Sequence, residues 1–238
     1  MNALLHAELL KLRTTRTFGV VVGTAAALSL IVVALGAGLG AETNPNALFT
    51  NTSITYIIVL LGAIGMTGEW RHRTITGSVL AAPDRLRLLA AKALAYSLAG
   101  VVLSLLVTLA TMLVGTLILG VRGEATLGPG GLADVLWRNL AVAALLGPLG
   151  VCIGALVRNQ IVTVVGLIVV SAVLEPAIFQ VAPGVGRFGP LAGAPGGILG
   201  GPDAHGLLAP GFASAILVAW ALALFAAAAW RLRERDLV

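Results

Sequence analysis

Six long apolar runs limit what this chain can fold into. Each has close to the roughly 20 apolar residues that a helix needs to cross about 30 Å of hydrocarbon. In lipid every backbone N–H and C=O group has to be paired within the protein, and these runs are apolar on all sides rather than alternating, so helices are expected and not barrel strands. The runs cover residues 18–40, 51–68, 93–119, 137–157, 160–182 and 208–230.

The composition points in the same direction. Of the 238 residues, 58% are hydrophobic and 11% are charged, whereas soluble domains have about 45–50% apolar and about 25% charged residues. One cysteine, Cys152, excludes an intrachain disulfide and a cysteine-based metal cluster. The cations lie at the ends of apolar runs and not on one soluble face, so nucleic acid is not expected as a partner. We expect an all-α integral membrane protein with a single transmembrane domain over residues 1–238, embedded in the lipid bilayer.

The positive charges predict the orientation. If the N-terminus is cytosolic, twelve of the fifteen Lys and Arg residues lie in inside segments, which agrees with the positive-inside rule. Both termini are therefore predicted to be cytosolic. The first run is longer than the 7–15-residue core of a secretory signal, so an uncleaved anchor is expected. The cations left outside are Arg122, Arg138 and Arg187.

A basic island at residues 68–92 interrupts the apolar pattern and holds five of the fifteen cations. It forms the largest predicted cytosolic loop, residues 69–92. Pro83 and Asp84 suit a helix start, so we expect a helix to begin there and to continue through Lys92 into the third span. The cations either hold topology and contact anionic lipid, at about 1 kcal/mol each, or form a docking surface. They are Arg71, Arg73, Arg85, Arg87 and Lys92.

The first seventeen residues are predicted to form a helix on the inner membrane surface. Leu5, Leu9 and Leu12 share one face at helical spacing, which is typical of an interfacial helix. A disordered basic tail is the alternative.

Two stretches resemble the permease of a type-2 ABC transporter, the membrane-spanning subunit of a bacterial ABC exporter. They are AELLKLRTTRT (Ala7 to Thr17) and GEWRHRTI followed by P-x-R-x-R-L-L-A-A-K (within Gly68 to Lys92). Six spans with both ends inside complete the resemblance, which covers nearly the whole chain. In that family an elbow helix lies at the N-terminus, and the loop is a coupling element that docks in a groove of the ATP-hydrolysing subunit.

The resemblance implies an ATP-driven exporter of a drug, peptide or lipid-like substrate in the bacterial plasma (inner) membrane. Its partners would be two copies of a cytosolic ABC ATPase and a second permease copy or a homologue. The docking residues of the coupling loop would be Glu69, Trp70, Arg71, Arg73, Thr74, Pro83, Arg85 and Arg87.

The chain lacks the motifs of catalysis. A P-loop needs G-x-x-x-x-G-K-[ST], and neither Lys11 nor Lys92 follows such a pattern. His6, His72 and His205 are scattered, and H-E-x-x-H and G-x-S-x-G are absent. We therefore expect no catalytic residue, metal or cofactor in this chain, with ATP hydrolysis in a separate subunit. The alternatives are an ion-coupled secondary transporter, which usually has an internal repeat, and a non-transporting immunity or scaffold protein.

Glu175 and Pro176 are the candidate pathway residues. A carboxylate within a membrane helix should face the interior, a cavity or a partner, and Pro176 should kink the helix nearby. Glu175 either lines the transport route or forms an ion pair near the outer interface, with Arg138 or Arg187.

The outer segment at residues 183–207 is rich in Gly and Pro, which stop regular helix. Short outer helices cap the pathway in the family, and this composition departs from that picture. We expect a loop that dips toward the interface and lines the outer gate, with a mobile surface loop as the alternative.

Overall fold

The structure is a computed structural model that describes residues 2–40, 44–50, 52–72, 74, 84–200 and 206–234. Those residues are helical or lie in short turns, and they contain no strand. The helices are α1 (Asn2–Thr14), α2 (Arg16–Leu39), α3 (Pro45–Phe49), α4 (Thr52–Arg71), α6 (Arg85–Arg122), α7 (Pro129–Val157), α8 (Gln160–Val169), the π-helical turn η1 (Val170–Leu174), α9 (Glu175–Val181), α10 (Pro183–Gly186), α11 (Gly193–Gly200) and α12 (Pro210–Glu234).

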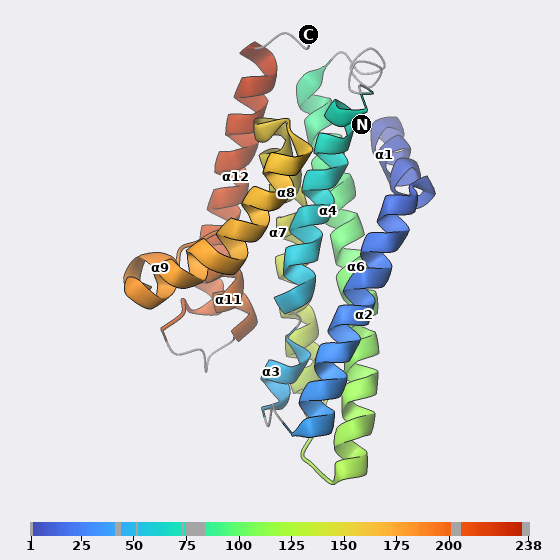
Figure 1. Ribbon diagram of the computed structural model, residues 1–238, viewed down its shortest axis with the longest axis vertical. Helices are drawn as coiled ribbons and strands as arrows, with labels where there is room; N and C mark the ends of the chain where they lie inside the picture. The colour runs from blue at the N-terminus through green and yellow to red at the C-terminus, as the bar shows by residue number, and fades with distance from the viewer. Residues whose placement is uncertain are drawn as a thin grey trace.

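Six helical stretches in the described part of the chain are long and apolar enough to cross a membrane, which confirms the predicted all-α membrane fold. Helix α1, the start of α6 and the end of α12 lie at the same end of the molecule (Figure 1). Which side of the membrane this end faces stays a prediction. The stretches are Phe18–Leu39, Pro45–Arg71, Arg85–Arg122, Pro129–Val157, Gln160–Val181 and Pro210–Arg233.

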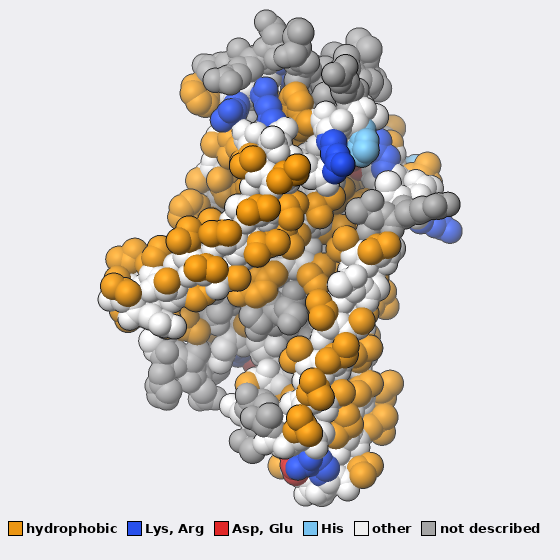
Figure 2. Space-filling model, viewed as in Figure 1, with side chains coloured by type: hydrophobic (Ala, Val, Ile, Leu, Met, Phe, Trp, Pro, Cys, Tyr) orange, Lys and Arg blue, Asp and Glu red, His pale blue; other side chains and the backbone are white. Residues whose placement is uncertain are grey.

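Helix α7 is the centre of the packing and contacts α4, α6 and α12. Most residues in the apolar windows of α4 and α7 are buried, at 60% and 56%, against 17% for α2 and 22% for α12. The face that includes α2, α8 and α9 is covered by hydrophobic side chains (Figure 2). Apolar side chains that stay exposed over several helices are expected where lipid replaces water as the surrounding solvent.

Glycines bring α4 and α7 into backbone contact. A Cβ atom at Gly62 would overlap the carbonyl oxygen of Gly147, and one at Gly150 would overlap that of Val59. Small residues allow such close approach in membrane helices, where packing must supply the association energy. Gly62 and Gly150 thus allow the backbones of α4 and α7 to approach closely.

Replacing Gly150 by Ala should therefore destabilise the fold by about 1–3 kcal/mol, because the added methyl group forces two backbones apart. The measurement is the thermal unfolding midpoint of purified protein in detergent. Gly166→Ala on α8 is the matched control, since a Cβ there would meet no atom within 4 Å. Equal midpoints for the two variants would contradict the close crossing.

Pro148 lies inside α7 without breaking it. Proline cannot donate a backbone hydrogen bond, so it frees the carbonyl of the residue four positions earlier, which is Ala144. The hydroxyl of Ser97 on α6 donates to that carbonyl at 2.8 Å. A neighbouring helix thereby supplies the bond that proline removes, as a backbone group in lipid requires.

Helix α6 begins where the sequence predicts. Asp84 is its N-cap, and its carboxylate accepts from the backbone N–H groups of Leu86 and Arg87 at 3.1 and 3.2 Å. The helix then runs unbroken from Arg85 to Arg122 over 38 residues. At 1.5 Å per residue it is about 57 Å long, so it extends beyond a bilayer core of about 30 Å.

The outer Gly/Pro-rich segment, which is predicted to be an irregular loop, is partly helical in the structure. Helix α10 covers Pro183–Gly186 and α11 covers Gly193–Gly200, although the composition predicts an irregular loop. Ala194, Ile198 and Leu199 of α11 are buried, and α11 packs on α12 and α7. Tertiary packing outweighs the low helix propensity of glycine, which costs about 1 kcal/mol per residue. Residues 201–205 of the segment lie outside the described part of the chain.

Candidate functional site

Four charged side chains meet near the end of the molecule that holds α1. Glu8 and Lys11 lie one turn apart on α1, Glu69 is near the end of α4, and Lys92 is two turns into α6. The ammonium of Lys92 binds Glu8 Oε2 at 2.6 Å and Glu69 Oε1 at 2.9 Å. The ammonium of Lys11 binds Glu8 Oε1 at 2.8 Å and Glu69 Oε1 at 3.0 Å. We call Glu8, Lys11, Glu69 and Lys92 the four-charge cluster.

Three of the four side chains in the cluster are buried. The side chains of Lys92, Glu8 and Glu69 are 2%, 5% and 10% exposed, whereas that of Lys11 is 50% exposed. Burial opposes the charged form of Glu8, but Lys92 and Lys11 outweigh it and lower the pKa of this carboxyl below 4.5. Burial likewise opposes the charge on Lys11, yet the hydrogen bonds that it donates to Glu8 and Glu69 and the charges of these carboxylates raise its pKa above 10.5. The shifts of these two residues favour their charged forms at neutral pH.

The cluster joins the two ends of the basic island. Glu69 precedes the island's central residues and Lys92 follows them, so their ion pair closes the loop at its base. Both also bind α1 through Glu8 and Lys11. On α1, Leu12 is buried, Leu5 and Leu9 pack against the same hydrophobic cluster, and the helix contacts α6. The leucine face predicted at the N-terminus therefore contacts the protein itself, while the position of α1 in the membrane surface stays a prediction.

The predicted docking residues differ in how exposed they are and in what their side chains contact. Glu69 is buried and its carboxylate is bound to Lys92 within the chain, and its part in docking stays a prediction. Trp70 is half-buried beneath the guanidinium of Arg158, 4.6 Å from the ring centroid. Arg71 is exposed and donates to the side chain of Gln160 at 3.3 Å. Thr74 is exposed.

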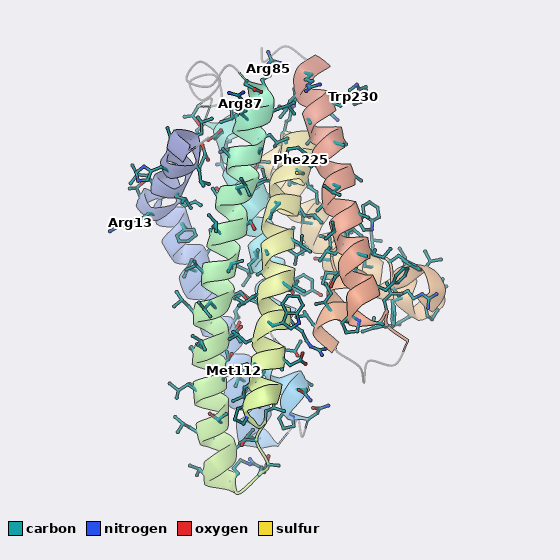
Figure 3. All side chains as sticks on the ribbon, turned by 180° about the vertical axis from the view of Figure 1, so that it is seen from behind. Arg13, Arg85, Arg87, Met112, Phe225 and Trp230 are labelled. Carbon is teal, nitrogen blue, oxygen red and sulfur yellow. The ribbon has the colours of Figure 1, made fainter. Side chains whose placement is uncertain are left out.

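At the start of α6, Arg85 and Arg87 lie at the same end of the molecule as Trp230 of α12 (Figure 3). Arg85 donates to the backbone carbonyl of Leu232 at 2.6 Å, which ties the start of α6 to α12. Arg87 pairs with Asp84 at 3.0 Å, and its side chain is 71% exposed. Arg73 and Pro83, both predicted docking residues, lie outside the described residues.

Glu175, the first residue of α9, forms a second polar site next to the start of α11. Its carboxylate accepts from the backbone N–H groups of Leu191, Ala192 and Gly193, with Oε2 at 3.1, 2.5 and 3.2 Å. Gly193 is the first residue of α11, so the carboxylate caps the positive end of a helix dipole. Neither predicted ion pair forms, because Arg138 binds Asp134 at 2.6 Å and Arg187 lies over the ring of Phe188.

Helix geometry changes immediately before Glu175. Residues Val170–Leu174 form a π-helical turn, and Pro176 follows at the start of α9. The π-helical turn lies one turn before Pro176, and the kink predicted near Pro176 stays a prediction. Residues Gln160–Val181 form one continuous helical stretch that contains this π turn, a feature that is frequent at functional sites. Beyond the turn, Glu175 ties α9 to the start of α11.

The charge pattern alone does not find the four-charge cluster. It predicts Lys11 and Lys92 as cytosolic cations, with Lys92 either holding topology or belonging to a docking surface, and it assigns nothing to Glu8. One signal for a partner is available in the sequence, because Lys92 lies among Ala90, Ala91 and Ala93. A lysine in an apolar helix requires a carboxylate nearby, although its spacing does not say which one.

In the described part of the chain, six apolar helices pack together and buried ion pairs join α1, α4 and α6, which defines a multi-pass membrane protein. A comparison with protein families matches residues 4–175 to the family described as ABC-2 family transporter protein. The chain belongs to this family, because the match covers more than half of it. It is therefore an ABC transporter permease, of a family whose members typically work with an ATPase subunit. No curated protein matches the chain.

Proposed function

We propose that this chain is the permease of an ATP-driven exporter in the bacterial plasma membrane, coupled to a separate ATPase subunit. Two permeases, either two copies or one copy and a homologue, would assemble with two ATPases. The observation that carries the proposal is the ion-paired base of the basic island. A force applied to the loop by an ATPase would reach α1, α4 and α6 together, because Lys92 and Lys11 join all three helices.

The exported substrate would be a drug, a peptide or a lipid-like molecule. ATP would be bound and hydrolysed in the partner, since this chain has no glycine-rich sequence ending in Gly-Lys-Ser/Thr. The purified permease alone should therefore neither bind nor hydrolyse ATP.

Charge reversal of Arg71 and Arg87 tests the docking surface. Both side chains are exposed, whereas Arg85 is omitted because it binds α12 internally. We expect Arg71→Glu with Arg87→Glu to weaken association with the ATPase by on the order of a hundredfold, about tenfold for each 1.4 kcal/mol lost. The measurement is co-purification with a co-expressed ABC ATPase subunit, together with the ATP hydrolysis that the permease stimulates.

Arg13→Glu is the control, since Arg13 is exposed on α1 outside the loop. Reversal can also invert a membrane protein, so the topology of each variant is checked by labelling engineered cysteines from either side. Intact association in correctly oriented double variants would rule out docking through these arginines.

A further inference from the structure

A cavity of about 730 Å³ lies beside the four-charge cluster, between α1, α2, α4 and α6. Its size is within the range of roughly 300–1,000 Å³ that is typical of small-molecule sites. Most of its wall is apolar and comes from all four helices. The apolar lining includes Leu12, Phe18, Leu61, Ile64 and Leu88.

The polar groups that line this cavity include hydrogen-bond donors and acceptors, and they differ in exposure. Lys11 lines it with a side chain that is half exposed, and the exposed His72 lines it as well. The lining carboxylates of Glu8 and Glu69 are instead buried and held by lysines. Of the charged side chains that line the cavity, Lys11 is therefore the most exposed to a ligand, and its ammonium is already paired with Glu8 and Glu69.

The cavity lies at the depth where lipid headgroups are expected. Phe18, which lines it, is the first residue of the membrane-spanning stretch Phe18–Leu39. Lys11 lies on α1, before that stretch begins. The ammonium group is thus at the level where a bilayer changes from acyl chains to headgroups, and the apolar wall lies beside it.

We propose that this cavity binds an anionic phospholipid, with the phosphate at Lys11 and an acyl chain along the apolar wall. The ammonium complements the charge of the phosphate, and Leu61 and Ile64 of α4 contact the chain. A soluble anion would leave the apolar wall unfilled, and a zwitterionic lipid would bring a second cation toward Lys11. The proposal does not rest on the proposed function, because binding requires neither ATP nor an ATPase.

The test uses the full chain in nanodiscs of phosphatidylcholine, with or without a minor fraction of phosphatidylglycerol. Native mass spectrometry counts the phosphatidylglycerol retained after release, and the thermal unfolding midpoint gives an independent readout. We expect retained phosphatidylglycerol and a raised midpoint for the parent protein. Lys11→Gln should weaken retention about fivefold, as the loss of one surface cation near a membrane does.

Two control variants distinguish a specific lipid site in the cavity from nonspecific attraction of anionic lipid to the protein surface. Arg13→Gln removes the same charge from the same helix, but Arg13 does not line the cavity and points away from the helices (Figure 3). Gly68→Leu adds an apolar side chain to the cavity wall, at a glycine where a Cβ would meet no atom within 4 Å apart from its chain neighbours. Gly166→Leu on α8 is its control, because that glycine has equally open surroundings away from the cavity.

The proposal predicts that Lys11→Gln and Gly68→Leu each reduce retention while Arg13→Gln and Gly166→Leu do not. Equal losses in Lys11→Gln and Arg13→Gln would overturn it in favour of diffuse surface attraction. Unchanged retention in Gly68→Leu would show that no acyl chain enters the cavity. Inorganic phosphate titrated into phosphatidylcholine nanodiscs distinguishes the source of the anion, and a midpoint shift as large as that from phosphatidylglycerol would overturn the lipid assignment.

Discussion

Replacing Lys92 by Met is expected to lower the free energy of unfolding by about 3 kcal/mol. The side chain is 2% exposed and binds both Glu8 and Glu69. Removing one partner from a buried ion pair costs about 3–5 kcal/mol, because the remaining charge is left without compensation. Lys11 still binds both carboxylates, so the lower end of that range applies. The thermal unfolding midpoint should fall by roughly 6–12 °C for a chain of this size.

Arg87→Met is the matched control for this variant. Arg87 lies on the same helix and is also ion-paired, but its side chain is 71% exposed. Exposed pairs contribute about 0–1 kcal/mol, so its midpoint should hardly change. Adding Glu8→Gln to Lys92→Met removes one of the uncompensated charges and should recover part of the loss. Lack of recovery, or equal effects at Lys92 and Arg87, would contradict an electrostatic role for the cluster.

Replacing Glu175 by Gln is expected to destabilise the protein by about 2–4 kcal/mol and to spare transport per folded complex. The carboxylate accepts from three backbone N–H groups at the start of α11. Glutamine has one acceptor oxygen where glutamate has two, and its amide group would face an N–H donor. Bonds to a charged acceptor contribute about 1.5–3 kcal/mol, and a buried donor left unpaired costs about 1–3 kcal/mol.

Two measurements are needed for the Glu175 variant. The unfolding midpoint is compared with that of Glu124→Gln, a partly exposed carboxylate paired with Arg122, for which less than about 1 kcal/mol is expected. Transport in reconstituted vesicles is normalised to the folded complex. An unchanged midpoint with reduced transport would instead place Glu175 on the transport route and remove its structural role.

Several parts of the fold follow from local physical chemistry and can be predicted without the structure. Apolar runs of about 20 residues form helices in lipid because no other conformation satisfies an isolated backbone there. The start of α6 follows from Asp84, whose side chain caps the nearest amide groups. Each of these outcomes depends on neighbours in the chain or on the solvent, and both can be read from residue types.

The partners of the polar groups depend on neighbours in space, which residue types do not specify. Glu8 and Lys92 are 84 positions apart, and they meet because α1 packs on α6. A carboxylate within an apolar run predicts a buried partner for Glu175, and arginine is one candidate. The partners in the structure are instead backbone N–H groups at the start of α11. Helix α11 itself forms in a Gly/Pro-rich stretch, since burial against α7 and α12 offsets its weak propensity.

The apolar pattern thus establishes an all-helical membrane protein with six spans, because transfer into lipid acts on each segment by itself. The tertiary structure alone pairs Lys92 with two carboxylates, places Glu175 at the start of α11 and brings Gly62 and Gly150 into the crossing of α4 and α7. Hydrogen bonds, ion pairs and backbone contacts act over about 3–4 Å. They are decided only once helices distant in the sequence have packed side by side.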